Sequence, residues 1–63
     1  MKFAHVADML RLTLTNAPKA DRIRLLSSLR EYAKVYHGTW RALMKTSAFQ
    51  AIVQAIIDAA EAE

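Results

Sequence analysis

The sequence contains no cysteine, one glycine and one proline among its 63 residues. The absence of cysteine excludes disulfide bonds and thiolate metal sites. A single glycine excludes a glycine-rich phosphate-binding loop, and the low glycine and proline content argues against a disordered chain. We therefore expect an ordered protein that has to find its stability without a covalent cross-link.

Long hydrophobic runs are also missing. No apolar run approaches the roughly 18 residues of a membrane-spanning helix. At the N-terminus, His5, Asp8 and Arg11 interrupt the apolar residues before they could form the core of a signal peptide. The sequence therefore predicts a soluble, cytoplasmic protein.

Side chains that carry out chemistry are few and scattered. The two histidines, His5 and His37, have no cysteine beside them and no clear set of carboxylates with which to hold a metal. The six acidic residues form no spaced pair in apolar surroundings, and the serines have no base at a recognisable spacing. We expect no enzymatic activity, no catalytic or metal-binding residue and no cofactor.

What the chain has in quantity is apolar helical sequence. The apolar fraction is 54%, yet a chain of this size buries only about 60% of the surface that its unfolded form exposes. Small domains of this kind often gain their remaining stability from a second chain. The composition thus favours an oligomer, most simply a homodimer.

The apolar residues recur at helical spacing along the whole chain, and no segment alternates as a strand would. The sequence therefore predicts a single all-α domain, a small bundle of three to four helices. Their expected ranges are about 2–15, 18–37, 40–45 and 48–62. Gly38 is expected to end the second of these helices in a left-handed conformation, with Thr39 capping the next. Ser47 and Gln50 have the spacing of a capping box at the start of the last helix.

The last predicted helix is apolar on two sides. One side carries bulky residues, namely Phe49, Ile52, Val53, Ile56 and Ile57, and is expected to fill the core. The other side carries alanines at positions 48, 51, 55, 59 and 62, where small side chains allow another backbone to come close. That second backbone is either the first helix of the same chain or a second chain, unless the alanines serve only as good helix formers. The candidate interface residues are Leu12, Trp40, Ala51, Ala55 and Ala59.

Positive charge is concentrated in the first part of the chain. Residues 1–45 contain all nine lysines and arginines, whereas residues 46–63 contain only three acids among their charged groups. Such a basic body could contact nucleic acid phosphates, and the candidates for this are Arg24, Arg30, Lys34, Arg41 and Lys45. The segment 30–47 also has the helix–glycine–helix outline of a DNA-binding motif, although its residue types fit that motif poorly. A solvated basic face and an anionic membrane surface are the alternatives, and the membrane is disfavoured.

Together these features favour a non-enzymatic helical protein that acts by protein–protein contact, as an adaptor, an inhibitor or a host-modulating regulator. We expect it to work as a homodimer with a further protein partner. The alternative is a transcriptional regulator that binds nucleic acid through the basic residues of 18–37 together with Arg41 and Lys45.

Overall fold

Four helices form the fold in the computed structural model, which describes the backbone of residues 3–62 and the side chains of residues 5–62. They are α1 (Phe3–Thr15), α2 (Lys19–Val35), α3 (His37–Leu43) and α4 (Ser47–Glu61). The described backbone contains no strand, so the predicted all-α class is confirmed. Lys2, at which the first predicted helix begins, lies outside the described residues.

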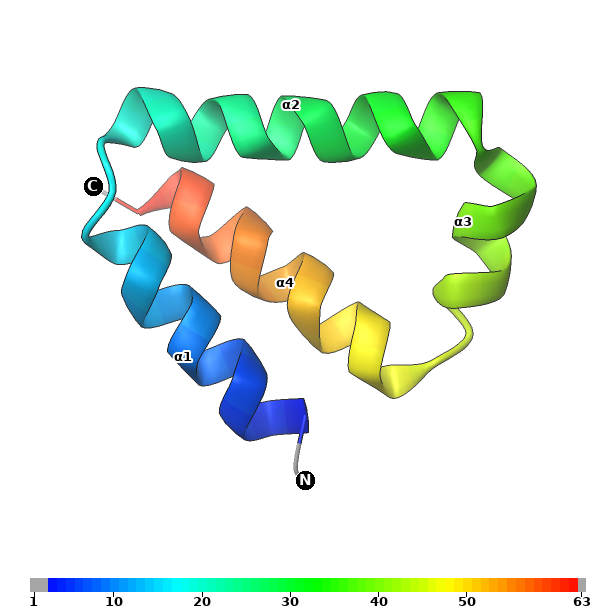
Figure 1. Cartoon of the computed structure of the whole chain (residues 1–63), viewed down its shortest axis with the longest axis horizontal. Helices are drawn as coiled ribbons and strands as arrows, with labels where there is room; N and C mark the ends of the chain where they lie inside the picture. Colours follow the sequence, from blue (N-terminus) through cyan, green and yellow to red (C-terminus); the bar gives the residue numbers. More distant parts are fainter. Residues whose placement is uncertain (1–2, 63) are drawn as a thin grey trace.

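α4 is the central helix. It runs beside α1 in the same direction, α2 runs back on its other side, and α3 closes the wide end between α2 and α4 (Figure 1). α4 packs most extensively against α1 and next against α2. The Cα atoms extend over 32 × 28 × 13 Å, so the helices form one compact but thin layer with two broad faces.

The buried centre of the layer is made mostly of small side chains. Ala55 and Ala59 of α4 are 0% and 1% exposed, and Ala7 of α1 is also buried. Asp58 follows Ala55 by three residues and therefore lies on the same side of α4, where it forms an ion pair of 3.2 Å with Arg11 of α1. The alanine face thus packs against α1 of the same chain.

The sequence left two neighbours open for the candidate interface residues Ala55 and Ala59, namely the first helix of the same chain or a second chain. Both alanines are already covered within one chain, because small side chains allow α1 and α4 to approach closely. No side chain larger than alanine is fully buried among those described, and the two largest in the core, Val53 and Ile56, keep 7% and 8% of their surface exposed. The small side chains between α1 and α4 are therefore buried, but the layer buries few large side chains.

The corner between α2 and α3 differs from the prediction. α2 ends at Val35, and Tyr36 forms the corner with φ −113° and ψ 49°. Gly38 does not have a positive φ and lies inside α3. The Tyr36 N–H donates to the Tyr32 carbonyl at 2.8 Å, and the Trp40 N–H donates to the Tyr36 carbonyl at 2.8 Å. Because these bonds continue across the corner, no left-handed residue is required there.

The expected N-cap at Thr39 is wrong for the same reason. α3 begins at His37, so Thr39 is its third residue, and no side chain caps this helix. α3 also ends earlier than predicted, at Leu43 instead of residue 45.

A break before α4 is present where the sequence predicts it, although the capping residue is the neighbour of the one expected. Thr46 is the N-cap, and its Oγ1 accepts a hydrogen bond of 3.3 Å from the Phe49 N–H. The same hydroxyl donates to the Leu43 carbonyl at 2.7 Å. The Gln50 side chain turns back as expected but donates to the Met44 carbonyl at 2.6 Å. α4 consequently begins at Ser47, one residue early.

Candidate interaction surfaces

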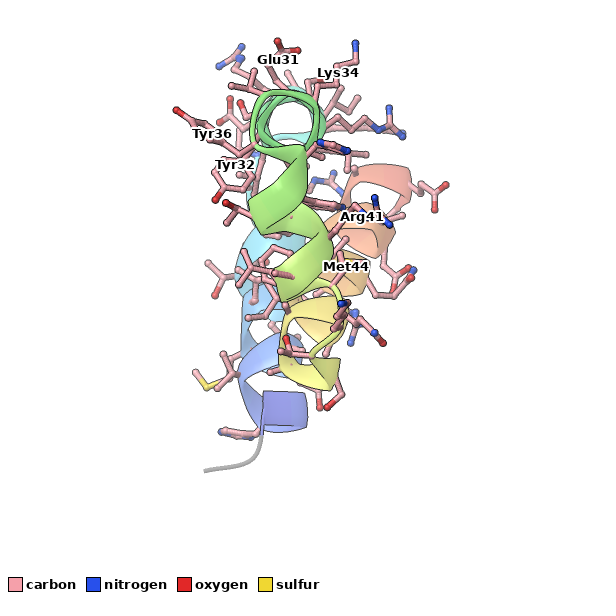
Figure 2. All side chains as sticks on the ribbon, turned by 90° about the vertical axis from the view of Figure 1, so that its right-hand side faces the viewer. Glu31, Tyr32, Lys34, Tyr36, Arg41 and Met44 are labelled. Atoms are coloured by element: carbon pink, nitrogen blue, oxygen red, sulfur yellow. The ribbon has the colours of Figure 1, made fainter. Side chains whose placement is uncertain are left out.

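The two broad faces of the layer differ in chemistry along α2. Tyr32 and Tyr36 project to one side of the layer, whereas Lys34 and Arg41 lie toward the other (Figure 2). Tyr32 and Lys34 are two residues apart, which corresponds to about 200° around a helix axis. The helix geometry and the figure therefore agree that aromatic and basic side chains occupy opposite faces.

The aromatic side carries a stripe that we call the tyrosine face, made of Leu25, Tyr32 and Tyr36. Leu25 precedes Tyr32 by seven residues, and Tyr36 follows it by four, so all three share one side of α2. They are 37%, 38% and 56% exposed, respectively. The ring centroids of the two tyrosines are 5.0 Å apart. Asp21 precedes Leu25 by four residues on the same side of α2, so the stripe is free of charged side chains from Leu25 to Tyr36.

The tyrosine face is joined to the rest of the layer by further aromatic contacts. The ring centroids of Tyr32 and Trp40 are 6.4 Å apart, and those of Trp40 and Phe49 are 5.3 Å apart in an edge-to-face arrangement. Trp40, a predicted interface residue, is half-buried in this chain of rings between α2 and α4. The contacts fix the orientation of the tyrosine face, and an interface role for Trp40 remains a prediction.

The other predicted interface residues do not gather into one patch. Leu12 is exposed on α1, and Ala51 is half-buried on α4. The C-terminal half of α1 and the helix α3 lie at opposite ends of the layer (Figure 1). The structure therefore does not bring Leu12 and Trp40 together.

Opposite the tyrosines lies a second surface, which we call the basic face, made of Arg30, Lys34 and Arg41. Arg30 and Lys34 are four residues apart and share one flank of α2. Lys34 and Arg41 lie toward the same side of the layer (Figure 2). All three are exposed, and none forms an ion pair with a described residue.

Two further residues were expected to contact nucleic acid. Arg24 forms an ion pair of 3.3 Å with Asp21 in the first turns of α2, so its charge is partly neutralised. Lys45 is exposed in the turn that follows α3. Of the five candidates, the structure brings Arg30, Lys34 and Arg41 to one face.

The helix-turn-helix outline of the segment 30–47 is wrong. Such a motif joins its two helices by a turn of about three or four residues. Here a single residue, Tyr36, separates the end of α2 from the start of α3. α3 is therefore fixed as a continuation of α2 around a corner.

Arg22 is the residue whose role sequence reasoning missed. It is only 7% exposed, and it is the one buried charged side chain among those described. Its Nη1 donates to the carbonyls of Ala59 and Ala62 at 2.7 and 3.3 Å. The signal for this position is spacing, because Arg22 lies four and eleven residues before Leu26 and Ala33, on the side of α2 that faces α4.

Within the described residues, no pocket is found and no three metal-ligating side chains come together. In the same part of the chain, no helix combines the length and apolar character needed to cross a bilayer. No protein-family model, curated protein or solved structure matches the chain significantly. The function has to be inferred from the two faces of the layer.

Proposed function

We propose that this chain is a non-enzymatic interaction protein that works as a homodimer, with the tyrosine face of one copy packed against the tyrosine face of another. The observation that carries this proposal is a thin helical layer with an uncharged, aromatic stripe uncovered on one broad face. The dimer would then act by displaying its outer surfaces to other macromolecules.

The exposed area of the single chain supports a missing partner. A compact monomer of 7.1 kDa is expected to expose about 4,100 Å², whereas this chain exposes 4686 Å². Its radius of gyration is 11.8 Å, compared with about 10.6 Å for a typical domain of this length. Both values describe a chain that is flatter than a self-sufficient domain.

The layered shape suggests how the missing contact is made. Domains are normally built from two or three packed layers around a shared core, and here the second layer is missing. One broad face spans 32 by 28 Å, so it offers at most about 900 Å². This matches the area of about 800 Å² that each partner contributes to a standard protein–protein interface. A second copy of the chain would supply a layer of the right size.

Charge favours the tyrosine face over the opposite one as the self-contact. The chain carries a net charge of +3, and two copies meeting through the basic face would place like charges together. Leu25, Tyr32 and Tyr36 present no charge, and tyrosine is enriched in the centres of protein interfaces. Association through this stripe therefore avoids the repulsion.

The test is the mass of the protein in solution over a range of concentrations, measured by analytical ultracentrifugation. We expect the wild type to form a dimer and the variants Leu25→Glu and Tyr36→Glu to be monomers, because each places a charge inside the apolar contact. Circular dichroism of each variant checks that the helices remain.

Ile23 offers a matched control on the same helix. It is apolar and 48% exposed, but it lies nine residues from Tyr32, which places it half a turn away on the opposite side of α2. Ile23→Glu should leave the dimer intact. A wild type that stays monomeric, or an Ile23→Glu variant that dissociates as readily as Leu25→Glu, would contradict the proposed interface.

A further inference from the structure

We infer that the basic face binds the phosphate backbone of duplex DNA without regard to sequence, and that the dimer bridges two DNA segments. Contact of one chain with DNA depends only on Arg30, Lys34 and Arg41. Bridging rests in addition on the proposed dimer through the tyrosine face.

The charge distribution around the α2–α3 corner carries the first part of the inference. Residues 30–45 contain four basic residues and a single acid, Glu31. Glu31 projects along the outer edge of the layer, whereas Lys34 and Arg41 lie toward the basic face (Figure 2). The described acids of α4, Asp58 and Glu61, belong to its C-terminal end, which is the end farthest from α3 (Figure 1). The basic face therefore has little nearby negative charge to neutralise it.

Stabilisation of the helix dipole explains two of the three basic residues on this face but not the third. Lys34 lies in the last turn of α2, and Arg41 lies in the last turn of α3, where the helix dipole favours a cation. Arg30 lies before the last turn and gains little from the dipole. All three side chains are exposed, so they are free to pair with the phosphates of a polyanion.

The same geometry argues for contact with the backbone instead of the bases. Base reading normally requires a helix that can enter the major groove. α3 has only seven residues and is held against the end of α2 by the corner at Tyr36. The basic groups lie on a broad face, and phosphate contacts from such a face carry no sequence information.

Because the tyrosine face and the basic face lie on opposite sides of the layer, the dimer can bridge two DNA segments. When two copies meet through their tyrosine faces, their basic faces point outward, away from each other. Such a dimer cannot place both basic faces on adjacent half-sites of one straight duplex. It presents one phosphate-binding surface on each side, so each dimer can hold two separate DNA segments.

The binding test is a titration of a mixed-sequence DNA duplex with the intact protein at several salt concentrations. With three phosphate contacts per chain, affinity should fall about 40-fold between about 50 and 200 mM salt. The double variant Lys34→Gln/Arg41→Gln retains one contact, so its affinity should fall only about 3- to 4-fold over the same range. The control Arg24→Gln also removes an exposed positive charge, but one already paired with Asp21, and should keep the wild-type slope.

The bridging test uses one duplex fixed to beads and a second duplex carrying a fluorescent label. The wild type should retain the labelled duplex on the beads. Leu25→Glu should bind each duplex separately but fail to join them, because it is expected to be a monomer. This variant separates the two ideas: loss of the dimer abolishes bridging, whereas loss of the basic face abolishes binding.

Several results would overturn the inference. The first is that the wild type does not bind duplex DNA at about 50 mM salt. The second is that Arg24→Gln weakens the salt dependence of the affinity as much as Lys34→Gln/Arg41→Gln does. The third is that a monomeric Leu25→Glu still bridges two duplexes. Sedimentation with vesicles of anionic lipid in preference to DNA would assign the basic face to a membrane surface instead. If the wild type is monomeric but its DNA affinity still falls steeply with salt, the basic face binds DNA as inferred, and both the dimer and the bridging are wrong.

Discussion

Arg22 of α2 donates a hydrogen bond of 2.7 Å to the main-chain carbonyl of Ala59 in the last turn of α4. The last carbonyls of a helix have no partner within the helix, and the helix dipole makes its C-terminal end attractive to a cation. A second bond, to the Ala62 carbonyl at 3.3 Å, extends the same cap. One buried guanidinium thus closes α4 and ties it to α2. The C-terminal end of α4 lies near the point where α1 ends (Figure 1).

Replacing Arg22 tests this cap. We expect Arg22→Met to lower the free energy of unfolding by about 2 kcal/mol, because the hydrogen bonds to a charged donor are lost while most of the side-chain volume remains. Its Nε is buried without a described partner, so the loss of that unsatisfied group offsets a part of the cost. Urea unfolding followed by circular dichroism measures the difference.

Arg24→Met is the matched control for this prediction. Arg24 is on the same helix, but its side chain is 75% exposed and its partner Asp21 is also exposed. Exposed ion pairs of this kind contribute less than about 1 kcal/mol. Equal losses in the two variants would show that the carbonyls of α4 gain nothing from Arg22.

Ala55→Glu tests the seam between α1 and α4. Ala55 has no exposed surface, so a glutamate there has to bury a charge or push the helices apart, at a cost of more than about 3 kcal/mol. A domain of this length is stable by only about 3 to 9 kcal/mol. We therefore expect the variant to lose at least about a third of its stability, measured as a lower midpoint of urea unfolding followed by circular dichroism.

The control for the seam is Ala20→Glu. Ala20 is exposed in the first turn of α2, where a negative charge is favourable to the helix dipole. This variant should unfold within about 0.5 kcal/mol of the wild type. A well-folded Ala55→Glu protein that merely fails to associate would instead place the alanine face on a second chain.

Local signals in the sequence were enough to predict most of the architecture. The three- and four-residue spacing of apolar side chains predicts four helices. In one straight helix Trp40 and Phe49 would lie on opposite sides, and this change of phase predicts the break before α4. Both signals depend on the chain alone, because the side of a helix that is apolar follows directly from residue spacing. The boundaries were wrong by a few residues, as at Gly38, which lies inside α3 because main-chain hydrogen bonding continues through Tyr36.

Residue spacing alone did not predict which side of α2 faces α4. Leu25, Tyr32 and Tyr36 look like the buried side of α2, but the structure leaves them exposed and turns Arg22 toward α4 instead. Two neighbouring stripes of α2 could face the core, and only the position of α4 selects between them. The opposition of the tyrosine face and the basic face is a consequence of that choice, so spacing alone does not predict it.

Thr46 and Ser47 provide a direct comparison of two candidate caps. Thr46→Ala should lower the free energy of unfolding by about 1 kcal/mol, because the Phe49 N–H loses the acceptor that caps α4. Ser47→Ala should change it by less than about 0.5 kcal/mol, because Ser47 is exposed and is already the first residue of the helix. Thermal unfolding of the pair decides between them, and the reverse order would restore Ser47 as the cap.

Gly38→Ala distinguishes the observed corner from the one that the sequence suggests. In the structure Gly38 is helical with no positive φ, and no atom lies within 4 Å of the position that a Cβ would take. Alanine should therefore stabilise α3 by about 0.5 to 1 kcal/mol, which raises the melting temperature by about 2 to 8 °C. The reciprocal change at an exposed position of the same helix, Ala42→Gly, should lower it by a similar amount. A left-handed Gly38 would give the opposite sign, because alanine is strained in that conformation, and a fall in melting temperature for Gly38→Ala would reject the continuous hydrogen bonding through Tyr36.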